Sequence, residues 1–222
     1  MVESAGVRSE DLLAGYVTGP AAATEATAVA VARAGSAAVV VLVEGVSDQI
    51  AVEVLAARHG RDLDAERVVV LPVGGAHGVA RQLRRFGGGG ARLVGLCDAG
   101  EVDVVRRAVV AAGLGAPTSR AGLARLGFFV CEADLEDELI RACGIPLATD
   151  VLAANGDLDA FRKIQRQPAW RGRDESAQMR RFLGAGSRRK LRYARLLTEA
   201  VPLDRVPPPL TALLDAIRPP GG

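Results

Sequence analysis

The chain has 222 residues, of which 49% are hydrophobic and only 4% aromatic, so we expect an aliphatic core rich in Ala, Val and Leu. This length suits one compact core with a helical extension, and a formal net charge of +2 indicates no class of partner by itself. No apolar run approaches the ~20 residues of a membrane span. A signal peptide is not evident at the N-terminus either. The three cysteines are odd in number, which favours reduced thiols and a cytoplasmic protein.

The beginning of the chain predicts helix. Residues 9–13 suit a short helix, and the alanine-rich stretch over residues 20–33 predicts a longer one with proline near its first turn. We therefore treat residues 1–36 as an N-terminal helical segment.

The first strong strand signal is the valine-rich run that begins at Ala37 and stops at Glu44-Gly45. A continuous β-branched run without polar alternation is typical of a strand buried on both faces of a parallel sheet. Ser47 is the expected N-cap of a helix over residues 49–59. Glu44 would then lie at the carboxyl end of a central strand, where open α/β sheets place their ligands.

Strands and helices alternate over the following hundred residues. Further strands are predicted over residues 67–71, 91–97 and 127–131. Helices are predicted over residues 79–86, 103–112 and 134–143, the last one ended by Gly144 and Pro146. This alternation indicates right-handed βαβ units, and hence an α/β fold with a Rossmann-like, mostly parallel sheet flanked by helices. The unit is placed at residues 37–146.

Residues 147–222 form a basic, helical C-terminal extension in this interpretation. Helices are predicted over residues 148–154, 157–166, 175–183, 187–200 and 209–217. Twelve Lys and Arg residues lie between Phe161 and Arg195, against two acidic residues. Such a stretch suits a phosphodiester backbone, with Trp170 stacked on a base. The alternative is a solvated helical face with Trp170 in the core.

Acidic residues follow three of the predicted strands. The three groups are Glu44 and Asp48; Asp98 and Glu101; and Glu132, Asp134, Glu136 and Glu138. Because the carboxyl ends of parallel strands meet at one edge, these groups can converge. Closely spaced carboxylates repel one another, and one or two Mg²⁺ or Mn²⁺ ions would relieve that repulsion. The competing interpretation is that each acid complements the dipole of the helix that follows it.

Three short sequences carry a family resemblance. LVEGVSD, followed by LCDAGE and then by ADLEDEL, resembles the Toprim domain, the catalytic fold of topoisomerases, primases and related nucleases. Within that superfamily the chain is most similar to the OLD-type (overcoming lysogenization defect) endonucleases, which pair a Glu with an Asp four positions later. The resemblance covers residues 37–144 and, more weakly, the helical tail. It implies that residues 37–146 form a Toprim catalytic domain.

The resemblance implies roles for the first two acidic groups. Glu44 corresponds to the Toprim glutamate, a metal ligand or general base, and Asp48 to the further acid of OLD-type sites. Asp98 corresponds to the first Asp of the D-x-D pair of the superfamily. Gly100 stands where the second Asp belongs. This departure leaves two alternatives: Glu101, the next residue along the chain, supplies the carboxylate in place of the second Asp, or one metal ion binds more weakly.

The resemblance also implies a second metal position and a catalytic cation. Glu136, with Asp134 or Glu138 beside it, would complete the second position. Lys190 matches the lysine that OLD-type enzymes carry on a C-terminal helix. The expected nucleic-acid contacts are Arg171, Arg173, Arg188, Arg189 and Arg192.

The activity implied is Mg²⁺- or Mn²⁺-dependent phosphoryl transfer on nucleic acid, with endonucleolytic cleavage of DNA favoured over RNA. OLD-type endonucleases usually carry an ATPase domain, so an ATPase partner in trans is expected unless this chain acts independently; a homodimer is left open. One alternative is a non-catalytic module that binds nucleic acid or a partner protein through a degenerate Toprim site. Another is an enzyme that acts on small phosphate esters.

Overall fold

The computed structural model describes residues 11–19 and 21–218, so the first part of the helix predicted over residues 9–13 lies outside the described residues. Asp11–Leu13 form a 3₁₀ helix, η1, and Ala22–Ala34 form α1, which confirms the helix predicted from the alanine-rich stretch. Every fourth residue of α1 from Ala22 to Ala34 is buried. This spacing is that of one helical face packed on a neighbour.

Four parallel strands form the sheet, in the order β2-β1-β3-β4. The strands are β1 (Val39–Val43), β2 (Val68–Pro72), β3 (Arg92–Cys97) and β4 (Phe128–Val130). All four were predicted, and β1 is central because Val39 pairs with Val68 on one side and with Arg92 on the other. The expected α/β class with a parallel sheet is therefore confirmed.

Helices follow the strands and then form the tail. They are α2 (Val46–Arg58), α3 (Ala76–Phe86), η2 (Ala99–Glu101), α4 (Val102–Ala111), α5 (Arg120–Arg125), α6 (Leu135–Ala154), α7 (Leu158–Arg166), α8 (Glu175–Leu183), α9 (Ser187–Ala200), η3 (Leu203–Arg205) and α10 (Pro208–Ala216). Within α6 the backbone breaks at Gly144, whose φ is 72°, so the predicted stop is a kink between two helical halves.

The start of α2 differs from the prediction. Ser47 is not an N-cap, because α2 already begins at Val46 and Gly45 occupies the N-cap position in an extended conformation. Oδ2 of Asp48 accepts a hydrogen bond from the backbone N–H of Gly45 at 2.9 Å. The acid predicted for the first turn therefore also closes the start of the helix, and Ser47 lies buried within that turn.

The sheet separates two layers of helices, and alternate residues of β1 face each layer. Val40 and Leu42 pack with residues of α1, α3, α4 and α5 in one cluster. Val39, Val41 and Val43 belong to the other cluster, with α2, α6 and α10. Because both faces are covered, β1 can be apolar at every position, as the valine run indicated.

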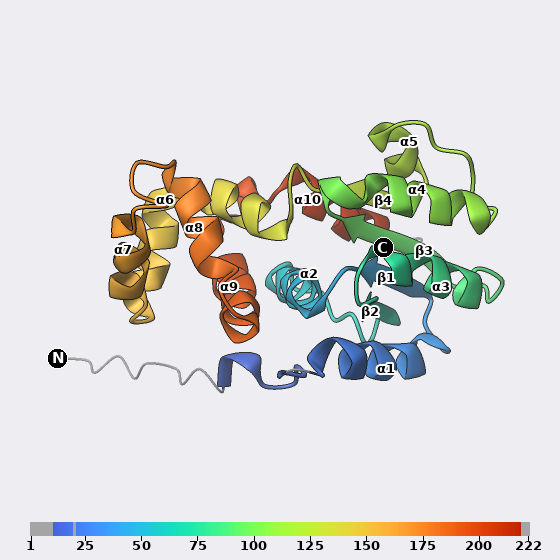
Figure 1. Cartoon of the computed structure of the whole chain (residues 1–222). Coiled ribbons are helices and arrows are strands. Elements are labelled where there is room, and N and C mark those ends of the chain that lie inside the picture. The colour runs from blue at the N-terminus through green and yellow to red at the C-terminus, as the bar shows by residue number, and fades with distance from the viewer. Residues whose placement is uncertain (1–10, 20, 219–222) are drawn as a thin grey trace.

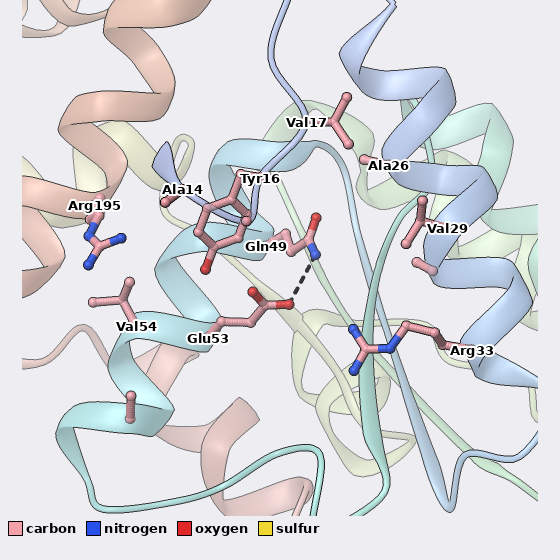
Figure 2. Close-up of a pocket in the computed structure, with 13 residues that line it drawn as sticks. Ala14, Tyr16, Val17, Ala26, Val29, Arg33, Gln49, Glu53, Val54 and Arg195 are labelled. Carbon is pink, nitrogen blue, oxygen red and sulfur yellow. Dashed lines mark hydrogen bonds between the residues drawn. The ribbon is translucent and has the colours of Figure 1, made fainter. Parts of the chain in front are cut away.

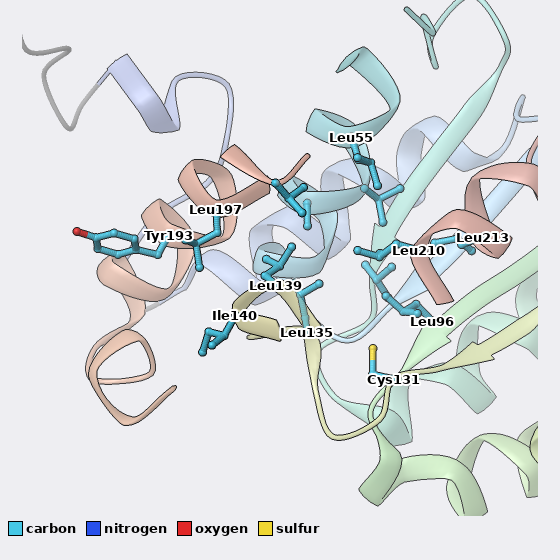
Figure 3. Packing of buried hydrophobic residues seen from close by; sticks show 14 of the residues in the cluster. Leu55, Leu96, Cys131, Leu135, Leu139, Ile140, Tyr193, Leu197, Leu210 and Leu213 are labelled. Carbon is cyan, nitrogen blue, oxygen red and sulfur yellow. The ribbon is translucent and has the colours of Figure 1, made fainter. Parts of the chain in front are cut away.

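The second cluster continues without interruption into the tail. Figure 3 shows Leu55 of α2, Leu139 of α6 and Leu197 of α9 turned toward a common interior. Figure 1 shows α7, α8 and α9 grouped on one side of α2, with the sheet on its other side. Nη1 of Arg58 also donates to the carbonyl oxygens that end α9, those of Thr198 (2.7 Å) and Val201 (2.6 Å). The tail is thus packed on the α/β core.

The cysteines agree with the expectation of reduced thiols. Cys97, Cys131 and Cys143 are all buried and free. Within residues 11–19 and 21–218, no helix combines the length and apolar character that a membrane crossing requires.

Candidate metal centre

Four predicted acids meet at the carboxyl rim of the sheet. Glu44 follows β1, Asp98 follows β3, Asp48 lies in the first turn of α2 and Glu136 in the first turn of α6. Asp48 feels the negative charges of Glu136 and Glu44, and Asp98 feels those of Asp48 and Glu44. The fold therefore brings together carboxylates that are up to 92 residues apart in the sequence, from position 44 to position 136.

The backbone of Glu44 is held by the glycine-rich loop after β2. Its carbonyl oxygen accepts hydrogen bonds from the N–H groups of Gly74 (3.1 Å) and Gly75 (3.2 Å). These glycines have φ angles of 73° and 96°, in the left-handed region that other residues rarely adopt. The loop thus fixes the point at which the chain leaves β1, and with it the start of the Glu44 side chain.

Asp48 is a buried carboxyl group, with 7% of its surface exposed. Burial raises its pKa to about 7, since an ionised carboxylate loses hydration inside the protein. The positive charge of Lys190 opposes the shift, while the negative charges of Glu136 and Glu44 increase it. At neutral pH this group is poised between its two protonation states.

Asp98 is perturbed in the same direction. Burial is the main cause that raises its pKa to about 8, and the charges of Asp48 and Glu44 add to the shift. A hydrogen bond with Glu44 also favours the protonated form of Asp98. In the metal-free protein, burial and the neighbouring carboxylates therefore favour the protonated form of Asp98.

Lys190 reaches the rim from α9. Its Nζ lies 3.3 Å from Oε1 of Glu136, whose side chain is 13% exposed. Burial raises the pKa of Glu136, and the lysine partly offsets this. For Lys190, burial acts to lower the pKa, but Glu136 and Asp48 more than compensate and raise it. The lysine therefore stays charged beside the acids.

Asp134 has a structural role at the start of α6. Its Oδ1 accepts a hydrogen bond from the backbone N–H of Asp137 at 2.9 Å, which caps the helix. Its Oδ2 accepts from Nε of Arg180 at 2.8 Å. Both oxygens thus have partners, and they connect α6 to α8. A metal-ligand role for Asp134 stays a prediction.

Glu138 also has both carboxylate oxygens engaged. Oε1 accepts from the backbone N–H of Glu132 at 2.7 Å, and Oε2 pairs with Nη2 of Arg141 at 2.7 Å. The side chain is 1% exposed. It lines a different cavity, with Arg141 and Pro208, so its place in the metal set also stays a prediction.

Gly100 leaves space where the D-x-D pattern has its second Asp. It lies exposed in η2, and a Cβ at this position would meet no atom within 4 Å. The structure therefore has room for an aspartate side chain at position 100, although the sequence has glycine there. Glu101, the suggested substitute, is half-buried at the end of η2.

The rim offers a divalent cation suitable donors, although not a finished site. Across the described ranges, no three His, Cys, Asp or Glu side chains are already arranged to hold an ion. Oε1 of Glu136 is buried, and Nζ of Lys190 lies 3.3 Å from it, so the lysine is the charge partner of this oxygen in the absence of a metal ion. Carboxylate oxygens are hard donors of the kind that Mg²⁺ and Mn²⁺ prefer, and a bound ion would relieve the repulsion between them.

The arginines predicted to bind nucleic acid are largely occupied within the tail. Nη1 of Arg192 donates to Oδ2 of Asp157 at 2.9 Å, and the guanidinium of Arg189 lies 4.2 Å from the ring centre of Phe182. Nε of Arg173 donates to the backbone carbonyl of Ala169 at 2.9 Å. Arg171 and Arg188 are exposed. Nucleic-acid contact by these five arginines stays a prediction.

Sequence reasoning missed a cavity of about 410 Å³ between η1, α1, α2 and α9. Figure 2 shows Tyr16, Gln49 and Glu53 turned toward one another inside it. Nε2 of Gln49 donates to Oε1 of Glu53 at 3.0 Å. Burial raises the pKa of Glu53, and hydrogen bonds with Gln49 and Tyr16 oppose the shift. These polar groups satisfy one another, so the cavity shows no reactive group.

The parallel sheet with acids at its carboxyl rim agrees with the Toprim-type fold that the motifs predicted. Residues 37–99 match the family model "Overcoming lysogenization defect protein-like, TOPRIM domain". The chain therefore carries an OLD-like Toprim domain.

Solved structures extend the likeness beyond the matched segment. The C-terminal region of the Xanthomonas campestris pv. campestris OLD protein aligns with a TM-score of 0.60 and 23% identity, over 82% of this chain and 94% of that one. The C-terminal region of the Burkholderia pseudomallei OLD protein aligns with a TM-score of 0.59 and 22% identity, over 82% and 97%. At these identities the likeness shows the shared fold. No curated protein sequence matches the chain.

Proposed function

We propose that this protein catalyses metal-dependent phosphoryl transfer on nucleic acid, with endonucleolytic cleavage of DNA as the reaction. The observation that carries the proposal is the convergence of Glu44, Asp48 and Asp98 on one rim of a Toprim-type sheet, with Lys190 beside them. Perturbed carboxyl groups that cluster at the end of a parallel sheet are typical of functional sites. The family match supports a nuclease-type domain.

Glu44, Asp48, Asp98 and Glu136 would hold one or two Mg²⁺ or Mn²⁺ ions. A bound ion supplies positive charge to the phosphoryl oxygens and makes water a better nucleophile. Loss of the proton that Asp98 keeps would free its carboxylate for this purpose. The donors come from two strand ends and two helix starts, so they are carried by rigid elements.

The remaining steps fall to side chains at the rim. Glu44 lies beside Asp98 within hydrogen-bonding reach, so it would accept the proton of the attacking water. Lys190, kept charged by Glu136 and Asp48, would stabilise the negative charge that develops on the phosphoryl group. DNA as the substrate and an ATPase partner in trans belong to the proposal on the strength of the family resemblance.

The test is conversion of supercoiled plasmid in the presence of Mg²⁺ or Mn²⁺. Glu44→Ala and Asp98→Ala should each lower the cleavage rate about 100-fold or more, which corresponds to roughly 2.7 kcal/mol of transition-state stabilisation. Asp103→Ala is the matched control, because the Asp103 side chain is 70% exposed on α4 and pairs with Arg106. Rim variants as active as the wild type would overturn the proposal.

A second candidate is a binding module without catalysis. It is favoured by Gly100 in place of the second Asp and by the absence of a finished ligand set in the described part of the chain. In that case nucleic acid would bind equally well with Mn²⁺ or with a chelator. Cleavage that depends on Glu44 would exclude this function.

A further inference from the structure

A cavity of about 580 Å³ lies between α1 and α3 and reaches the loop after β2. Gly74 forms part of its wall, and the N–H of the same residue donates to the carbonyl oxygen of Glu44 at 3.1 Å. The cavity therefore begins at the loop that fixes the rim. Its volume falls within the range of roughly 300–1,000 Å³ that is usual for small-ligand sites.

Two arginines give this cavity its charge. Helix α3 contains Arg81, Arg84 and Arg85 and no acidic residue. Arg81 and Arg85 are one turn apart, hence on the same side of the helix, and both line the cavity. Neither makes an ion pair with any residue that the structure describes. This differs from the tail, where Arg180 and Arg192 are paired with aspartates.

The wall also contains a buried polar group without a partner. Gln82 is 2% exposed and lines the cavity between the two arginines in sequence. Its Oε1 is buried and has no hydrogen-bond partner. A buried amide oxygen without a hydrogen-bond donor costs free energy, which a bound ligand could recover by donating a hydrogen bond to it. An amide presents both a donor and an acceptor, which suits a sugar hydroxyl or the edge of a base.

We propose that this cavity binds one nucleotide unit of the strand that the metal centre cleaves, with its phosphate on Arg81 and Arg85 and its sugar or base against Gln82. The inference rests on the proposed function, because the neighbouring rim supplies the reason for a nucleic-acid strand to lie here. Guanidinium groups form paired, charge-assisted hydrogen bonds with phosphate oxygens. The site would thus hold the strand beside the scissile phosphate.

Fluorescence anisotropy with a labelled single-stranded oligodeoxynucleotide, in a chelator that prevents cleavage, measures this contact directly. The double variant Arg81→Ala/Arg85→Ala should bind at least about tenfold more weakly. The slope of log K against log salt should fall by about 0.7, since the two arginines share one phosphate and each phosphate contact on a single strand contributes roughly 0.7. Gln82→Leu should weaken binding and leave the salt slope unchanged.

Arg84→Ala is the matched control, because it removes the same charge from the same helix at a residue that does not line the cavity. It should change the affinity less than twofold. Equal losses in Arg84→Ala, Arg81→Ala and Arg85→Ala would overturn the inference. Unchanged oligonucleotide binding in the double variant would also overturn it, even if free deoxynucleoside monophosphate competed with the oligonucleotide, because the competition would then occur at another site.

Cleavage assays separate this inference from the proposed function. If plasmid is never cleaved but the double variant still loses oligonucleotide affinity, the cavity is supported and the catalytic proposal fails. If cleavage depends on Glu44 but the double variant binds the strand like Arg84→Ala, the catalytic proposal holds and the cavity assignment fails.

Discussion

The acidic rim and the basic tail differ in how far their charges are paired. At the rim, Asp48 and Asp98 lie among other carboxylates, and their pKa values rise to about 7 and about 8. In the tail, Arg192 is bound to Asp157, and Arg189 covers the ring of Phe182. Charges that are paired hold helices together, whereas charges left to repel one another mark the place where a ligand is expected.

The same distinction applies among the acids themselves. Asp134 caps α6 and pairs with Arg180, and Glu138 pairs with Arg141. Glu44 and Asp98 instead share a hydrogen bond with each other. Neighbouring acids therefore divide into those held by basic or backbone partners and those that face other carboxylates.

The largest effect is expected at Lys190, which joins the two regions. Lys190→Ala should lower the cleavage rate about 100-fold, because under the proposed function it removes the cation that would stabilise the developing phosphoryl charge. Lys163→Ala, which removes an exposed lysine of α7, is the control in the same plasmid assay. Similar activity in the two variants would show that Lys190 has only a structural role.

A second effect should appear in stability. Arg192→Ala removes charged hydrogen bonds to Asp157 and Asn155, so unfolding in urea should show a loss of about 1.5–3 kcal/mol. Arg171→Ala, at an exposed position, should stay within about 0.5 kcal/mol of the wild type. If the two variants were equally stable, the hydrogen bonds of Arg192 would not stabilise the packing of the tail helices.

Gly100→Asp should improve metal binding at the rim, because it supplies the carboxylate that the D-x-D pattern has at this position. Because a side chain at this position has open space, we expect Mn²⁺ to bind about tenfold more tightly, a gain of roughly 1.4 kcal/mol. Gly88→Asp is the control, since Gly88 also has open space but lies in the loop after α3. Equal Mn²⁺ affinities in the two variants would mean that position 100 does not face the metal.

The last prediction concerns the dependence of stability on pH. The folded-state pKa values of Asp98 (about 8) and Asp48 (about 7) lie above the value of ~3.9 for an unfolded aspartate. The folded protein therefore binds more protons between about pH 4 and about pH 8, and its stability should fall as the pH rises through that window. Calorimetry in a chelator should show the melting temperature falling as the pH rises through that window. In Asp98→Asn the drop should be smaller, and an unchanged drop would count against the account.

Elements with strong local signals were predictable from the sequence. Residues 175–183 and 187–200 are helices with the expected bounds, because their apolar spacing and flanking glycines are local features. The helix over residues 120–125 was missed because six residues carry too little periodicity to register. Ser47 was preferred as an N-cap on side-chain type alone, although Gly45 and Asp48 together close that helix.

The convergence of Glu44, Asp48 and Asp98 followed from sheet topology, which the strand pattern indicated. Which acids would be engaged elsewhere could not follow from the pattern, because the partner of Asp134 comes from α8, 46 residues away. Glu138 was more accessible to prediction, since Arg141 lies three residues further along the same helix. The cavity at Arg81 and Arg85 depends on how α1 packs near α3, which no motif records.

Calorimetric titration of the protein with Mn²⁺ tests most directly whether the rim carboxylates share a divalent ion. The account predicts binding of the wild type at millimolar or lower concentration, weakened at least about tenfold in Asp98→Ala and unchanged in Asp103→Ala. A wild-type protein that binds no Mn²⁺, or binds it no better than Asp98→Ala does, would contradict it.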